Sequence, residues 1–173
     1  ALTLKYPDIL PSSLMPDGSL YSLGLVRNSV GSVINSKLYF NKEWLAAVGK
    51  SVPKTANELY EVLKAFKNND PNKNGKQDEI GLYTSSSHLQ MATLGMFGLS
   101  NRGSTNTHID MNPSTGKARY FPITDDYRKW VEYVSRLYRE GLLNKEYYEF
   151  TESKLGVYVG SNVCGALKNA KFG

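Results

Sequence analysis

The stretch Thr55–Leu82 reads TANELYEVLKAFKNNDPNKNGKQDEIGL. Thr55 with Glu58 three residues later is a capping box, in which each side chain accepts a hydrogen bond from a main-chain amide at the start of a helix. Apolar residues then recur at the spacing of one helix face, at Leu59, Val62, Leu63 and Phe66. The stretch therefore predicts a helix with one buried face, a polar loop and a short strand that begins at Ile80.

The polar loop, DPNKNGKQDE at Asp70–Glu79, has the composition of a calcium site. Calcium needs several oxygen ligands around one ion, and a loop supplies them when alternate side chains point inward and a glycine allows a sharp turn. Gly75 occupies the turn position. The candidate ligands of this structural Ca²⁺ are Asp70, Asn72, Asn74, the main-chain carbonyl of Lys76, Asp78 and Glu79.

The loop departs from the EF-hand pattern in one place. An EF-hand has a bidentate glutamate at its twelfth position, where this sequence has Gly81. We expect Glu79, at the tenth position, to take that role. The alternative is an ordinary turn rich in Asn and Gly, which forms without any metal.

Other elements follow from turn and cap residues along the chain. We expect strands at 20–26 and 33–40, a helix from Asn41 to Gly49, a helix after Ser85–Ser87, a strand at 118–121, a helix from Thr124 to Gly141 and a last strand at 155–159. In the helix from Thr124 the predicted buried residues are Tyr127, Trp130, Val131, Val134 and Tyr138. The segment 98–116 is rich in Ser, Thr, Asn and Gly, which predicts an exposed and mobile connection.

Composition excludes some classes of function. The 173 residues contain no apolar run long enough to span a bilayer. The 21 Lys and Arg are scattered among 16 acidic residues, so the net charge of +5 indicates solvated surface charge and no nucleic-acid partner. The single Cys164 excludes an internal disulfide, and we expect it to be buried.

Three segments resemble the extracellular solute-binding proteins (family 1) of bacterial carbohydrate ABC importers, in the branch that takes up oligosaccharides. They are LYFNKEWL at 38–45, VPKTANELYEVLKAFKNNDPNKNGKQDEIGL at 52–82 and ARYFPITDDYRKWVEYVSRLYREGLLNKE at 118–146. The resemblance implies an α/β fold, with a mixed sheet flanked by helices, that forms mainly one lobe of a two-lobe periplasmic-binding-protein-like structure. It implies hinge-proximal strands and the entry into the lobe at 1–30, and the lobe with calcium loop 70–79 at 31–173. In the family this loop binds calcium, and the match favours Glu79 as the last ligand.

Two places in the sequence are candidates for contact with a sugar, because they combine polar groups with the end of a predicted strand. One is Arg27 with Asn28, which by resemblance follows a strand leading through the hinge. The other is the strand-to-helix junction with Tyr83, Ser85, Ser86 and His88. The alternatives are that Arg27 is a surface cation and that His88 is an ordinary residue on a helix surface. Trp44 and Trp130 lie in apolar stripes, and we expect both in the core.

The resemblance implies that the protein binds an extracellular oligosaccharide and passes it to the membrane permease of an ABC importer. It implies an extracellular, cell-surface location through a lipid anchor outside this segment, or a periplasmic location. We expect no enzymatic activity, because the sequence contains no GxSxG, HExxH or phosphate-binding glycine loop. The alternative is a calcium-dependent, carbohydrate-associated interaction module without a transport role, although such modules normally carry two loops of this kind.

Overall fold

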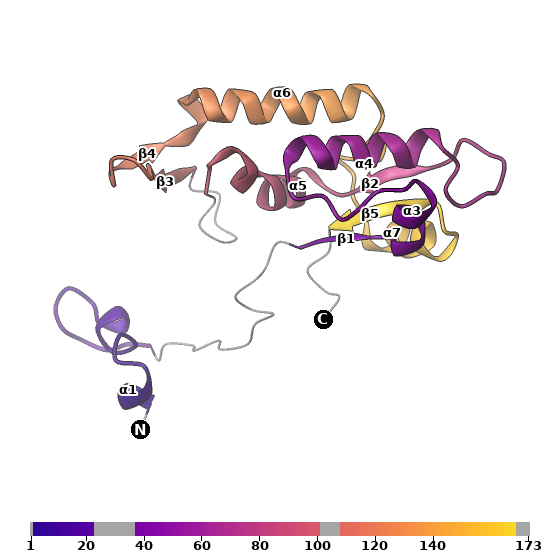
Figure 1. Cartoon of the computed structure of the whole chain (residues 1–173). Coiled ribbons are helices and arrows are strands. Elements are labelled where there is room, and N and C mark those ends of the chain that lie inside the picture. Colours follow the sequence, from indigo (N-terminus) through magenta and orange to yellow (C-terminus); the bar gives the residue numbers. More distant parts are fainter. Residues whose placement is uncertain (1, 23–36, 101–107, 169–173) are drawn as a thin grey trace. The chain divides into compact units, whose positions relative to one another are not determined.

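The computed structural model describes residues 2–22, 37–100 and 108–168. The chain divides into two compact units, Ala1–Asn35 and Ser36–Gly173, and each is described by itself. The first unit has a short helix α1 (Leu2–Lys5) and a 3₁₀ helix η1 (Pro11–Ser13) (Figure 1). A turn at residues 15–18 follows, in which Gly18 has φ 80° and its amide donates to the carbonyl of Met15. Leu20 and Tyr21 are not in a strand, and the rest of the strand expected there lies outside the described residues.

The second unit is built on a three-stranded mixed sheet with the order β1-β5-β2. Strand β5 (Cys164–Lys168) is central, β1 (Leu38–Phe40) pairs with it antiparallel, and β2 (Ile80–Tyr83) pairs with it parallel. The expected α/β fold with a mixed sheet flanked by helices is therefore confirmed. The strand expected at 33–40 is confirmed only at its end, since 33–36 lie outside the described residues.

Helices α3 and α4 confirm the predicted caps. The side chain of Asn41 caps α3 (Lys42–Ala47), and the Thr55 hydroxyl accepts the Glu58 amide at 3.1 Å to open α4 (Ala56–Asn68). The Glu58 carboxylate accepts the amide of Lys54 at 2.7 Å, one residue before the amide that a capping box uses. The four apolar residues predicted for this helix are all buried.

Neighbouring residues of β2 pack in different hydrophobic clusters. Leu82 packs in the cluster that contains Phe66 of α4 and Trp44 of α3. Tyr83, the next residue of β2, packs with Leu155 of α7 (Glu152–Gly160), and its ring lies 5.2 Å from that of Tyr158. Because successive side chains of a strand point to opposite sides, Leu82 and Tyr83 pack in different clusters.

Gly165 in the central strand packs directly against side chains of α3 and α4. A Cβ atom there would lie 2.6 Å from Cε3 of Trp44 and would also overlap the ring of Phe66. We expect Gly165→Ala to lower the free energy of unfolding by about 1–3 kcal/mol, because the added methyl overpacks this core. Urea unfolding followed by circular dichroism measures the change.

Gly156→Ala is the matched control, since a Cβ there meets no atom within 4 Å in the described part of the chain. Gly156 lies inside α7, where alanine favours the helix by about 0.5–1 kcal/mol. A Gly165→Ala protein as stable as the Gly156→Ala protein would contradict the close packing of β5.

Helix α5 (Ser86–Thr93) is followed by a series of short elements and a long helix within residues 94–139. They are the 3₁₀ helix η2 (Leu94–Phe97), a hairpin of β3 (Ile109–Met111) and β4 (Ala118–Tyr120), the 3₁₀ helix η3 (Phe121–Ile123) and α6 (Asp125–Arg139). The expectation of an exposed, mobile connection at 98–116 is wrong in its second half. Strand β3 lies there, and its Asp110 is 3% exposed because Arg119 of β4 pairs with it.

Two further expectations are wrong. Residues 155–159 form part of helix α7 instead of a strand, although Leu155, Val157 and Val159 alternate with other residues as in a strand. The side chain of Thr151 caps this helix, and Val157 is exposed, so the alternation does not mark a buried face. In α6, Val131 and Tyr138 are exposed, and the buried positions are Trp130 and Leu137.

The expected burial of three residues is confirmed. Trp44 and Trp130 are both buried, as is Cys164, whose pKa is raised to about 11 by that burial. Within the described residues, no helix has both the length and the apolar character needed to cross a membrane.

Candidate functional site

The loop that joins α4 to β2 folds around Asp70. Asp70, Lys73 and Gly75 adopt left-handed conformations, with φ of 43°, 57° and 74°. These let the chain turn back, so that Asp70 Oδ1 accepts the amide of Asn74 at 3.1 Å and Oδ2 accepts the amide of Gly75 at 3.0 Å. The carboxylate of Asp70, the first predicted ligand, therefore stabilises the turn that was predicted at Gly75.

The asparagines of the loop turn their side chains inward. Asn72 Oδ1 accepts the Asn74 amide at 3.1 Å, and Asn74 Oδ1 accepts the Lys76 amide at 2.7 Å. The Asn74 side chain donates to both carboxylate oxygens of Asp78, at 3.0 and 3.3 Å. The structure thus brings four of the predicted residues, Asp70, Asn72, Asn74 and Asp78, into one hydrogen-bonded loop.

Glu79 is the buried acid of the site. It is 8% exposed, and its Oε1 is buried with no hydrogen-bond partner among the described residues. Burial raises the pKa of the Glu79 carboxyl, and the negative charges of Asp78 and Asp70 raise it further. A buried carboxylate beside two other acids is costly unless a cation offsets the charge.

This donor set fits a hard cation such as calcium, which takes carboxylate, amide and main-chain oxygens together. The part of the chain that the structure describes contains no group of three or more His, Cys, Asp or Glu side chains placed to hold a metal ion. A site for calcium in this loop would therefore rely on the oxygens of Asn72 and Asn74 and on a main-chain carbonyl as much as on acids.

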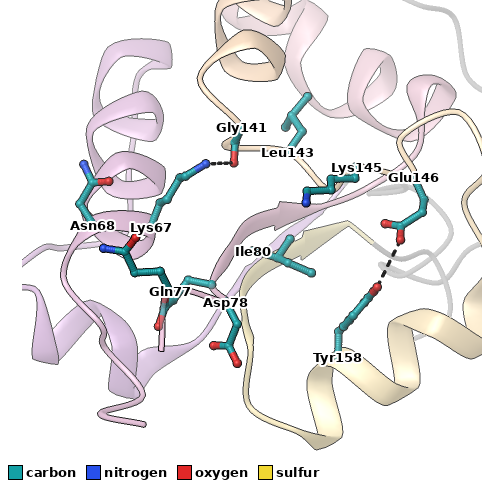
Figure 2. Close-up of a pocket in the computed structure, with 11 residues that line it drawn as sticks. Lys67, Asn68, Gln77, Asp78, Ile80, Gly141, Leu143, Lys145, Glu146 and Tyr158 are labelled. Carbon is teal, nitrogen blue, oxygen red and sulfur yellow. Dashed lines mark hydrogen bonds between the residues drawn. The ribbon is translucent and has the colours of Figure 1, made fainter. Parts of the chain in front are cut away.

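A pocket of about 420 Å³ lies beside the loop. Figure 2 shows its charged walls, to which Lys67, Asp78, Lys145 and Glu146 contribute. The Lys67 ammonium donates to the carbonyls of Glu140 and Gly141 at 3.1 and 2.9 Å, so it closes the C-terminal end of α6. The pocket joins the end of α4, the end of α6 and the start of β2.

The predicted sugar-contact residues lie at the junction of β2 and α5, except Arg27 and Asn28, which lie outside the described residues. Ser85 caps α5 by accepting the amide of His88, and Ser86 is exposed. His88 is half-buried, and its ring lies edge-on to that of Phe150, with 5.5 Å between centroids. Tyr83 is fully buried, so its ring supports the junction from beneath instead of offering an exposed face.

Sequence reasoning missed an aromatic groove beside Ser86. The groove has a volume of about 300 Å³, and its lining includes Trp130, Tyr138, Tyr147 and Tyr148. The rings of Tyr147 and Tyr148 are 5.0 Å apart, and Tyr148 is exposed. The adjacent tyrosines, in a stretch without helix or strand periodicity, were the signal in the sequence.

Comparison with known proteins places the chain. No model of a known protein family matches it. It is 34% identical over 158 residues to the fructooligosaccharide ABC transporter substrate-binding protein FusA of Streptococcus pneumoniae, a match that covers 83% of this chain and 29% of FusA. It is 29% identical over 170 residues to the polygalacturonan/rhamnogalacturonan-binding protein YtcQ of Bacillus subtilis, covering 92% of this chain and 32% of YtcQ. The chain is a partial homologue of the sugar-binding proteins of ABC transporters.

The fold agrees with that of such substrate-binding proteins. An extracellular solute-binding protein from Bifidobacterium longum subsp. infantis superposes with a TM-score of 0.81 at 26% identity, over 97% of this chain and 36% of that one. The chain therefore spans about a third of the length of these relatives. A structure of FusA in complex with fructo-nystose is of an EF-hand mutant, with a TM-score of 0.77 at 25% identity, over 98% of this chain and 35% of that one. That relative has an EF-hand.

Proposed function

We propose that this chain is part of a protein that binds an oligosaccharide outside the cell and delivers it to the membrane permease of an ABC importer. The observation that carries the proposal is the 34% identity to FusA, a fructooligosaccharide-binding protein, together with a shared fold over nearly the whole chain. These relatives are substrate-binding proteins and not enzymes, and the role proposed here needs no catalysis.

The same proposal includes a structural calcium site in the loop 70–79. Asp70, Asn72, Asn74, Asp78 and Glu79 would hold the ion with their side chains, and Lys76 with its carbonyl. Support comes from the orphaned, buried Oε1 of Glu79 and from the EF-hand of FusA. When bound, the ion supplies positive charge that offsets three acids and links the end of α4 to the start of β2.

The residues that we propose for the sugar-binding site are Arg27, Asn28, Tyr83, Ser85, Ser86 and His88. The exposed Ser86 at the start of α5 adjoins the aromatic groove, and tyrosine rings with nearby hydroxyls suit the C–H faces and hydroxyls of a sugar. The hydroxyl of Ser85 caps α5, so Ser85 would influence a bound sugar indirectly, by holding that helix in place. Tyr83 acts in the same indirect way.

We propose that the protein lies outside the cell, held at the surface by a lipid anchor, or in a periplasm. The relative from Bifidobacterium is described as extracellular, which supports the first location. No part of the proposed role requires a nucleic acid.

Isothermal titration calorimetry on the whole protein that contains this chain tests the binding function. Neutral fructooligosaccharides and acidic oligogalacturonides form the panel, and we expect saturable heat with at least one class, at micromolar or lower Kd. Replacing Tyr148, the exposed ring of the groove, by alanine is expected to weaken binding at least tenfold, because the ring that would stack on the sugar is lost. If no glycan of the panel produces binding heat while a protein scaffold binds tightly, the result would favour the interaction module instead.

A further inference from the structure

Asn162 joins the calcium loop to the core, although it lies ninety residues further along the chain. It occupies the turn between α7 and β5 with φ 55°. Its main-chain carbonyl accepts the side-chain amide of Asn72 at 3.0 Å. Its own side-chain oxygen accepts the indole N–H of Trp44 and the side-chain amide of Asn41, each at 3.1 Å. One residue therefore holds the loop on one side and helix α3 on the other.

The two ends of the Asn72 amide have different tasks. The oxygen faces the loop, where it accepts the Asn74 amide, and the nitrogen faces Asn162. Calcium would bind at the oxygen end, so the bond to Asn162 can persist in the loaded loop. An aspartate at this position would offer the same oxygen ligand but no N–H donor, because an ionised carboxylate only accepts hydrogen bonds.

The far end of this connection is deep in the core. Trp44 is 1% exposed, and its ring packs edge-on against Phe66 at 5.4 Å. Asn41 caps α3 with its side chain, and its main-chain amide donates to the carbonyl of Gly165 in the central strand at 2.8 Å. A shift of Asn72 can thus be passed to the Trp44 indole through Asn162, which is hydrogen-bonded to both residues.

We propose that Asn162 is a positioning residue for the calcium loop, and that through it calcium binding changes the environment of the Trp44 indole. The inference rests on the calcium site of the proposed function. It adds that Asn72 serves as both a ligand and a tether, and that the turn before β5 moves with the loop.

The two tryptophans of the chain allow a direct test by NMR. A ¹H–¹⁵N spectrum of the chain shows one indole signal from Trp44 and one from Trp130, whose N–H bonds to Thr93 at 2.9 Å, away from the loop. Trp130→Phe assigns the two signals. On titration with calcium, with binding measured in parallel by calorimetry, we expect the Trp44 indole signal to shift at least threefold more than the Trp130 signal.

Two substitutions in the loop separate ligation from tethering. Asn72→Asp keeps the oxygen but loses the donor to Asn162, so we expect calcium heat to remain while the Trp44 shift falls to the size of the Trp130 shift. Asn74→Asp makes the same change of charge in the same loop without touching Asn162, so the Trp44 shift should persist. Asn162→Gly, which suits the positive φ, keeps the carbonyl but releases Trp44, and should also abolish the shift.

The outcomes are distinct. Calcium heat without a selective Trp44 shift in the unaltered chain, or a full shift in Asn72→Asp, overturns the tether and leaves the calcium site standing. Absence of calcium heat in the unaltered, folded chain overturns both. Loss of the Trp44 shift in Asn74→Asp while that variant still binds calcium would also count against Asn162 as the route.

Discussion

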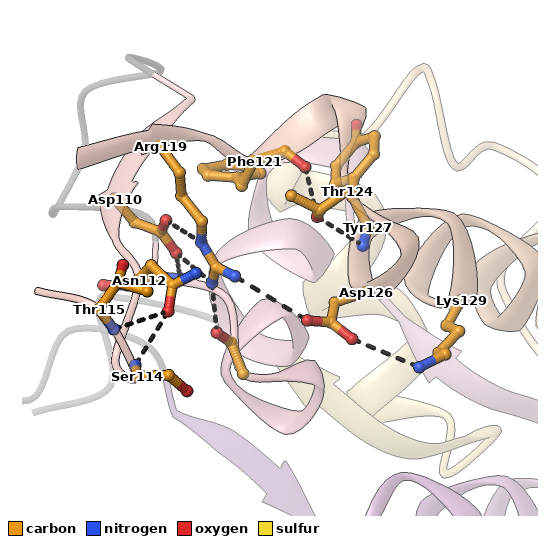
Figure 3. A network of polar contacts seen from close by, with 12 residues as sticks. Asp110, Asn112, Ser114, Thr115, Arg119, Phe121, Thr124, Asp126, Tyr127 and Lys129 are labelled. Atoms are coloured by element: carbon orange, nitrogen blue, oxygen red, sulfur yellow. Dashed lines mark hydrogen bonds and ion pairs between the residues drawn. The ribbon is translucent and has the colours of Figure 1, made fainter. Parts of the chain in front are cut away.

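Arg119→Met is expected to lower the free energy of unfolding by about 3–5 kcal/mol, because it strips a buried carboxylate of its partner. The side chain of Asp110 is 1% exposed, and Arg119 Nε lies 2.6 Å from its Oδ1. Arg119 Nη2 donates to Asp110 Oδ2 at 3.0 Å and to the Gly98 carbonyl at 2.8 Å. Figure 3 shows this network joining the β3–β4 hairpin to Asp126 at the start of α6.

Urea unfolding at pH 7, followed by circular dichroism, measures the loss. Arg128→Met is the matched control, because Arg128 is exposed on α6, and its loss should change stability by less than about 0.5 kcal/mol. The double variant Asp110→Leu with Arg119→Met should recover much of the loss, since it removes both charges. A single Arg119→Met variant as stable as the Arg128→Met control would contradict the buried pair.

The same pair makes stability depend on pH. The hydrogen bond from Arg119 lowers the pKa of the Asp110 carboxyl below its usual value. A carboxyl whose pKa is lowered by folding contributes stability that is fully present above its unfolded pKa of about 3.9 and is lost as pH falls through the folded value. In Arg119→Met that contribution is absent at neutral pH, so the difference in stability from the unaltered chain should shrink below about pH 4.

Glu79→Gln is expected to remove the stabilisation by calcium. With about 1 mM calcium and a Kd near 1 μM, binding to the folded state alone adds about 4 kcal/mol to the stability of the unaltered chain. The neutral amide cannot serve as a bidentate anionic ligand, so we expect less than about 1 kcal/mol of gain in the variant. Melting temperatures with added calcium and with chelator give the comparison.

The variant should behave in the opposite sense without calcium. Glu79 is buried beside Asp70 and Asp78, and loss of its charge relieves repulsion, so Glu79→Gln in chelator should be as stable as the unaltered chain or more so. Glu61→Gln, at an exposed acid of α4, makes the same change of charge and should keep the full calcium response. An equal calcium response in Glu79→Gln and Glu61→Gln would exclude Glu79 as a ligand.

Much of this fold could be predicted where the decisive contacts are local. Asn41, Thr55, Ser85 and Thr124 each cap a helix within three residues of themselves, so the sequence alone places the start of that helix. The inward turn of the Asn72 and Asn74 side chains in the loop is also local, because each accepts a hydrogen bond from an amide two residues away.

The features that sequence reasoning missed depend on distant partners. Strand β5 contains Gly165 and Ala166, which favour strands weakly, and it becomes central because Phe66 and Trp44 pack on it. Asp110 is buried with two partners distant from it in sequence, Arg119 across the hairpin and the main-chain amide of Ser100. The tether at Asn162 cannot be seen in the sequence, since Asn72 lies ninety residues away.

The place of β5 between β1 and β2 also sets the order in which the chain can assemble during synthesis. Strands β1 and β2 do not touch each other in the described sheet, and the strand that joins them is the last element described. Until residues 164–168 leave the ribosome, β1 and β2 each present an unpaired edge that can pair with other chains. Translation therefore makes β5 after both of its neighbours, and a nascent chain shorter than residue 164 leaves those two edges of β1 and β2 without their partner strand.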